Sequence, residues 1–126
     1  MIPYKKEEVI RTLKVEPGKE PVAAMLSNNL SSLQSAVGGF IELVGIDENV
    51  CILCNEEGKL MGLEGNRRLG NDVLVGTFYV VGVNQEGDLT SLTEDQLQKF
   101  AQQFKEPEVI TQEEIRQATT FIFYGG

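Results

Sequence analysis

Val73-Leu74-Val75-Gly76-Thr77-Phe78-Tyr79-Val80-Val81-Gly82-Val83 is the long uncharged apolar run of this 126-residue chain. Apolar residues occupy both parities of the run, which is typical of a strand that is covered on both faces. The run is much shorter than the ~20 residues that a membrane-spanning helix requires. The sequence therefore predicts one central strand over residues 73–83, inside a folded domain.

Segments upstream of this run predict further strands and a helix. Val9–Val15 alternates as a strand does, and the proline and glycine that follow it form a turn sequence. Phe40–Ile46 and Val50–Asn55 flank a polar turn and predict an antiparallel hairpin. We also expect a strand over Pro21–Leu26, and a helix after Ser27-Asn28-Asn29 with Leu30, Leu33 and Val37 on one face.

Downstream segments predict helices and a last strand. Thr93-Glu94-Asp95-Gln96 is a capping box for a helix that ends before Pro107. A short helix is expected from Thr111 to about Ala118, followed by a strand over Thr120–Tyr124. The expected fold class is α+β, a mostly antiparallel sheet with two to three helices packed on it. We expect one domain over 1–126, with a core over 9–107 and an extension over 108–126. Its last strand either adds to the edge of its own sheet or pairs with another chain, and we favour pairing into a homo-oligomer.

A glycine-rich segment before the apolar run is predicted to be a loop, and it carries the candidate ligand-binding residues. Adjacent guanidinium groups with an amide beside them can hold a phosphate or stack on a base. In the alternative interpretation, one arginine pairs with Glu64 or Asp72, and Arg116 pairs with Glu113 on a helix surface. The candidate ligand-binding residues are Asn66, Arg67, Arg68, Phe78, Tyr79 and Arg116.

Charge and composition narrow the possible partners. A net charge of −8 without a basic run argues against binding of duplex nucleic acid, and no apolar segment suggests a membrane. A small anionic nucleotide ligand stays compatible with a local group of arginines. The negative charge could instead imitate nucleic acid toward a basic partner, or serve solubility.

Catalytic and metal chemistry find little support in the sequence. The chain has no histidine, nucleophile motif or phosphate-binding loop, so we expect no enzyme, no catalytic residues and no cofactor. A hydrolase that uses Glu57 or Glu64 is the remaining catalytic alternative. Cys51 and Cys54 lie three apart in a predicted strand and face opposite sides, so we expect buried thiols and no metal site. A cytoplasmic location is expected, the host cytoplasm if a phage encodes the protein.

Residues 13–107 resemble a small domain of unknown function that is common in Firmicute phages and mobile elements. The resemblance is carried by Leu33–Glu42, Cys54–Leu60 and Gly76–Gly82 together with Lys14–Lys19 and Asn66-Arg67. In element order and C-terminal extension, the chain is also similar to phage anti-defence proteins that inhibit the Thoeris system. That similarity implies binding and sequestration of a cyclic ADP-ribose isomer or a cyclic oligonucleotide without cleavage, with Arg67 and Arg116 at the site. The alternative is an acidic interaction protein that blocks a nucleic-acid-binding enzyme, as anti-restriction and anti-CRISPR proteins do.

Overall fold

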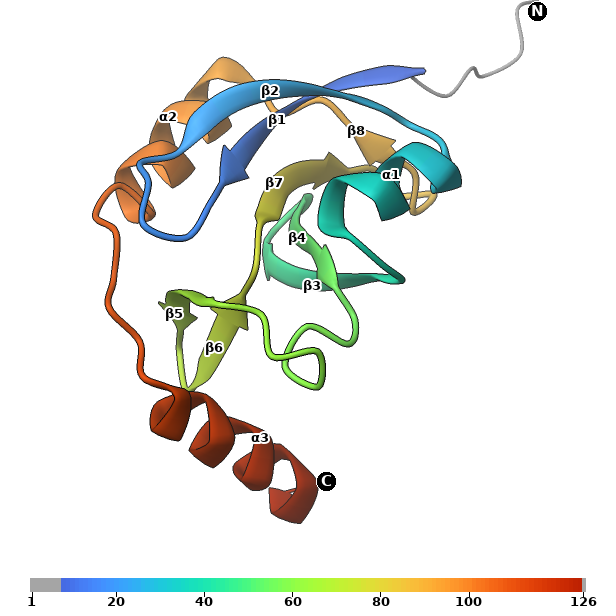
Figure 1. The fold of residues 1–126 in the computed structure, drawn as a ribbon. Helices are drawn as coiled ribbons and strands as arrows, with labels where there is room; N and C mark the ends of the chain where they lie inside the picture. The colour runs from blue at the N-terminus through green and yellow to red at the C-terminus, as the bar shows by residue number, and fades with distance from the viewer. Residues whose placement is uncertain (1–7, 126) are drawn as a thin grey trace, which may run out of the picture.

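One antiparallel sheet, in the strand order β2-β1-β7-β4-β3 with β8 paired to β7, forms the body of the protein (Figure 1). The computed structural model describes residues 8–125, and side chains as far as residue 118. The α+β fold class, with a mostly antiparallel sheet and helices packed on it, is confirmed. The main-sheet strands are β1 (Val9–Val15), β2 (Val22–Ser27), β3 (Ile41–Asp47), β4 (Val50–Asn55), β7 (Phe78–Val83) and β8 (Leu89–Thr90).

Helices cover both faces of this sheet. α1 (Leu30–Val37) begins at Asn29, whose side chain accepts from the amide of Ser32, and α2 (Glu94–Gln103) begins with the expected capping box. The α1 side buries one apolar cluster that includes Leu33 and Val81, and the α2 side buries another that includes Phe100 and Val80. The prediction of a central strand covered on both faces is therefore confirmed for β7, whose residues 78–82 are all buried.

The expectation of one continuous strand over 73–83 is wrong. The chain breaks at Gly76, whose φ of 69° lies in the left-handed region that glycine adopts without strain. β6 (Asp72–Val75) then belongs to a second, two-stranded sheet, and only β7 belongs to the main one. A Cβ atom at residue 76 would also lie 2.7 Å from the side chain of Leu63. This glycine thus separates the two sheets.

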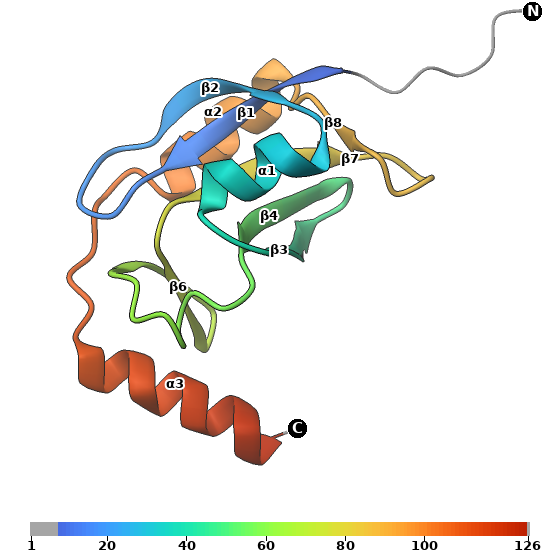
Figure 2. The same ribbon diagram turned by 45° about the vertical axis from the view of Figure 1, so that its right-hand side comes forward.

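The second sheet is a hairpin inside the segment that was expected to be a loop. β5 (Gly65–Leu69) pairs with β6 around the two-residue turn Gly70-Asn71, with Leu69 opposite Asp72. Buried side chains of β6 pack against α3 (Gln112–Gly125), which lies beyond the hairpin and away from α1 and α2 (Figure 1, Figure 2). This small cluster consists of Val73, Val75 and Ile115, with Leu63, Ile110 and Ala118 against it.

The C-terminal extension is one helix, so the expected strand over Thr120–Tyr124 is wrong. Ile115, Ala118 and Ile122 recur at three- and four-residue spacing, which is the period of a helix. Because these residues are helical, the expected pairing of two chains through an aromatic edge strand does not apply. How the aromatic side chains of 121–124 are placed lies outside the described residues, and the homo-oligomer stays a prediction.

Within residues 8–125, no helix combines the length and the apolar character that a membrane span needs.

Candidate functional site

Asn66 is a buried structural residue of β5. Its side chain is 0% exposed, and its amide nitrogen donates to the carbonyl oxygens of Val15 at 2.9 Å and Gly76 at 2.8 Å. The first bond reaches the end of β1, and the second reaches the break between β6 and β7. Asn66 thus joins the hairpin to the main sheet, and both its amide hydrogens are occupied by protein.

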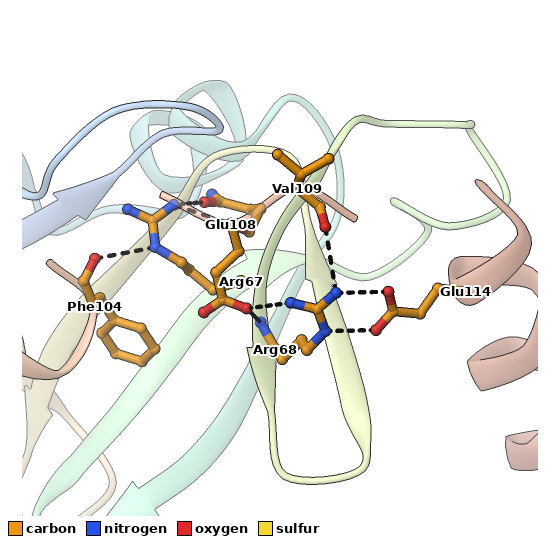
Figure 3. A network of polar contacts seen from close by, with 7 residues as sticks. Arg67, Arg68, Phe104, Glu108, Val109 and Glu114 are labelled. Carbon is orange, nitrogen blue, oxygen red and sulfur yellow. Dashed lines mark hydrogen bonds and ion pairs between the residues drawn. The ribbon is translucent and has the colours of Figure 1, made fainter. Parts of the chain in front are cut away.

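Arg67 lies in the interior, although the sequence suggested a ligand-binding role. Its side chain is 0% exposed, and Nε donates to the carbonyl oxygen of Phe104 at 3.0 Å (Figure 3). One terminal nitrogen donates to the carbonyl of Lys19 at 2.6 Å, and the other to the backbone and side-chain oxygens of Asn66. Burial lowers the pKa of this guanidinium, although Glu108 opposes the shift. Arg67 therefore joins the β1–β2 turn, the end of α2 and β5, and this structure offers no part of it to a ligand.

Arg68 points to the opposite side of β5 and is held by the C-terminal segment. Nε and one terminal nitrogen donate to the two carboxylate oxygens of Glu114 at 2.6 and 2.8 Å (Figure 3). The other terminal nitrogen donates to Glu108 at 2.9 Å. These two carboxylates raise the pKa of Arg68, Glu114 most strongly. The expected alternative of an ion pair is thus seen, but the partners are Glu108 and Glu114 rather than Glu64 or Asp72.

The two aromatic candidates belong to the two cores. Phe78 is 0% exposed and makes an edge-to-face contact with Phe104 on the α2 side, with ring centroids 5.3 Å apart. Tyr79 is 5% exposed on the α1 side, where burial raises the pKa of its phenol. Their opposite directions are as predicted from strand alternation, but neither ring is presented to a ligand.

Arg116 forms an exposed ion pair with Glu113 on α3, which was the alternative interpretation of this residue. Asn66 and Arg67 are hydrogen-bonded, and Arg67 and Phe78 both contact Phe104 in the interior. Tyr79 is buried on the other side of the sheet, and Arg68 and Arg116 lie at the surface. The six candidates therefore do not converge on one site.

Nearly all described lysine and arginine side chains are paired with carboxylates or buried within the protein. Among the side chains of residues 8–118, every cation except Lys105 and the buried Arg67 forms an ion pair. Several exposed carboxylates form no ion pair within those residues. They are Glu8, Glu20, Glu42, Glu48, Glu56, Glu57, Glu64, Glu86, Asp95 and Glu106. The exposed surface of the described residues therefore carries an excess of negative charge.

A cavity of about 290 Å³ lies between β3, β4, β6 and the segment after β4. Val44, Cys54 and Leu74 are among its apolar lining residues, and they extend the α2-side core. Glu42, Glu56, Lys59 and Asp72 are its charged lining residues, and Lys59 forms an ion pair with Asp72. We call this the β3–β6 cavity.

Sequence reasoning did not find the β3–β6 cavity. Gly70-Asn71 is a hairpin-turn sequence, and it could have predicted the β5–β6 hairpin that contributes Asp72 to the cavity. The break at Gly76 carries no comparable signal, because the apolar pattern continues through it. The thiol of Cys54 has its pKa raised to about 12, first by burial and then by Glu42 and Asp72. This thiol is therefore no nucleophile at neutral pH.

Comparisons with known proteins identify the family and nothing more specific. No curated protein and no solved structure matches the chain. A family model described as a domain of unknown function matches residues 10–105, which span the main sheet, the hairpin, α1 and α2 but end before α3. The chain therefore belongs to the DUF3846 family of domains of unknown function.

Proposed function

We propose that this protein is a non-enzymatic, acidic interaction protein that blocks the basic surface of a nucleic-acid-binding partner. One observation carries the proposal: among the described side chains, every cation except Lys105 is buried or ion-paired, whereas many carboxylates are exposed without such partners. A surface of this kind attracts a basic groove and repels nucleic acid. The resemblance to domains of phages and mobile elements points to a restriction or CRISPR enzyme as the partner.

An inhibition assay tests this proposal. Purified protein is added to a panel of restriction and CRISPR nucleases, and cleavage of plasmid DNA is measured. We expect inhibition of at least one nuclease, relieved by excess DNA and by salt because the contacts are electrostatic. Absence of inhibition across the panel at micromolar protein contradicts the proposal.

A matched pair of variants identifies the charges that matter. Glu57, Glu64, Asp95 and Glu106 are exposed and have no ion pair among the described residues, so their conversion to amides should leave the fold intact. We expect this quadruple variant to inhibit about tenfold less well. Arg68→Ala keeps all carboxylates and is the control, which should inhibit as well as the wild type. Loss of inhibition in the control alone contradicts an acidic binding surface.

A second candidate function is sequestration of a small anionic nucleotide, such as a cyclic ADP-ribose isomer or a cyclic oligonucleotide. One observation favours it: Arg68 lines a cavity of about 450 Å³ between the hairpin turn and α3, together with Gln117. A phosphate would have to replace Glu108 or Glu114 as the partner of this guanidinium.

Calorimetry against cyclic ADP-ribose isomers and cyclic di- and trinucleotides tests the second candidate. If the protein sequesters a nucleotide, we expect the wild type to bind one of these compounds and Arg68→Ala to abolish the binding. Intact nucleotide should be recovered after heat denaturation of the protein. Recovery of an altered nucleotide would instead indicate a hydrolase. No binding across the panel contradicts sequestration.

A further inference from the structure

The β3–β6 cavity combines an apolar interior with an acidic rim. Its interior is formed by Val44, Cys54, Leu74 and neighbouring aliphatic side chains, of which Cys54 and Leu74 are buried. At about 290 Å³ it lies at the lower end of the ~300–1,000 Å³ range of small-molecule pockets. A cavity of this size accepts one long side chain more readily than a cyclic dinucleotide.

The charges around the cavity favour a cation. Three residues with carboxylates, Glu42, Glu56 and Asp72, line the cavity together with one lysine, Lys59. Asp72 is already paired with Lys59, whose side chain is 19% exposed. Glu42 and Glu56 are exposed and have no ion pair within residues 8–118. The thiol of Cys54 donates to the Glu42 carboxylate at 4.0 Å, and both carboxylates can still receive a further positive group.

The surroundings of the buried Cys54 thiol show the same excess of negative over positive charge. Burial is the main reason that the pKa of Cys54 is raised. Glu42 and Asp72 raise it further, and Lys59 lowers it by less than either. The carboxylates that line the cavity outnumber the single lysine, so an anionic ligand is disfavoured there.

We propose that the β3–β6 cavity binds a lysine side chain of a basic partner protein, with its methylene stem against Val44, Cys54 and Leu74 and its ammonium group at Glu42 and Glu56. Long cationic side chains bury their stems against apolar surface while the charged head stays at a polar rim. Lys59 shows that this rim accommodates an ammonium group beside a carboxylate. The inference rests on the proposed interaction with a basic partner, and it names the anchoring contact.

Nuclear magnetic resonance titration of the full chain with Nα-acetyl-lysine N-methylamide tests the inference without the partner. We expect saturable, millimolar binding that shifts backbone amides of residues 54–60 and 72–75. The norleucine analogue has a similar stem and no ammonium group, and the glutamate analogue carries a negative charge. We expect the first to bind about fivefold more weakly and the second not at all. Equal binding of the lysine and norleucine analogues, shifts outside the cavity, or no binding would overturn the proposal.

Paired amide variants locate the charges. Glu42→Gln with Glu56→Gln should weaken binding of the lysine analogue about fivefold. Glu48→Gln with Glu86→Gln removes two exposed carboxylates that do not line the cavity, and it should leave binding unchanged. An unchanged affinity in the first variant, with an unchanged unfolding midpoint, overturns the proposal. Nuclease inhibition without lysine binding refutes only the cavity contact, whereas lysine binding without inhibition of any nuclease refutes the proposed function.

Discussion

Arg67 and Arg68 are consecutive residues of one short strand, yet their surroundings are opposite. Arg67 is fully buried and donates only to carbonyl and amide oxygens, whereas the side chain of Arg68 is 45% exposed and is held by two carboxylates. Strand alternation places them on opposite faces of β5. The inner face packs against the main sheet, and the outer face meets the segment that leads into α3 (Figure 3).

Two adjacent arginines beside an asparagine therefore do not by themselves indicate a ligand-binding site. An Asn-Arg pair on a hairpin can recognise a phosphate, but here it satisfies backbone carbonyls where three segments meet. Without Arg67, the buried carbonyl of Phe104 would lose this donor in the interior, where water does not replace it. Arg68 connects only the hairpin and the C-terminal extension. The two arginines therefore stabilise different parts of the molecule.

The largest effect is expected for Arg67→Ala. It leaves the carbonyls of Lys19 and Phe104 without this donor and opens a cavity, so we expect a loss of about 3 to 5 kcal/mol of unfolding free energy. Urea denaturation followed by circular dichroism measures it, with Arg68→Ala as the matched control. A loss below about 1 kcal/mol in Arg67→Ala would contradict the structural role.

Ile115→Ala should have the second-largest effect, and a local one. Ile115 is 4% exposed against Val73 and Val75, and a large-to-small change at such a site costs about 2 kcal/mol or more in local packing. We expect amide hydrogen exchange to accelerate in α3 and in the β5–β6 hairpin, while the slow exchange of β7 is retained. Equal acceleration in β7 would show that α3 is part of the main cooperative unit.

Removal of the Arg68 ion pair should have a smaller effect than either. Glu114→Ala removes one of the two carboxylate partners of Arg68, and Arg68→Ala removes the contacts to both. The double variant should therefore exchange amides in α3 no faster than Arg68→Ala alone. Exposed pairs contribute little to global stability, so the unfolding midpoint should move less than for Ile115→Ala. Additive effects of the two substitutions on α3 exchange would argue against the pairing.

The smallest effect is a dependence on pH that the Arg68 contact should show and the Arg67 contacts should not. Arg68 holds the pKa of Glu114 below its ordinary value of 4.5, so the contact stabilises the fold above that value and is lost as the pH falls through the lowered pKa. The acceptors of Arg67 do not titrate in this range. Carbon-13 titration of the Glu114 carboxylate measures this, and a midpoint at or above 4.5 would contradict it.

Local signals predicted most of the main sheet. The range of β1 was predicted to the residue, as was that of β4, and the helix starts at Asn29 and Thr93 follow from side-chain capping. These elements carry their information within a few residues. The strand over 120–124 was wrong because aromatic content was given more weight than the helical spacing from Ile115 onward.

The candidate site could not be predicted in the same way. The burial of Arg67 depends on carbonyls 48 residues before it and 37 residues after it, and no short pattern encodes such contacts. The β3–β6 cavity likewise requires the chain to break at Gly76, so that β6 leaves the main sheet. The sequence did show the excess of negative charge. Together with the ion pairs seen in the structure, this excess supports the proposed acidic interaction surface.

The guanidinium resonances of Arg67 and Arg68 test the central claim most directly. In a nitrogen-15 labelled sample, we expect the Nε proton of Arg67 to exchange slowly with water and that of Arg68 to exchange faster. Addition of cyclic ADP-ribose isomers and cyclic dinucleotides should leave the Arg67 signal in place. Fast exchange of the Arg67 proton, or a saturable shift of its signal on nucleotide addition, would contradict the account and return this arginine to a ligand site.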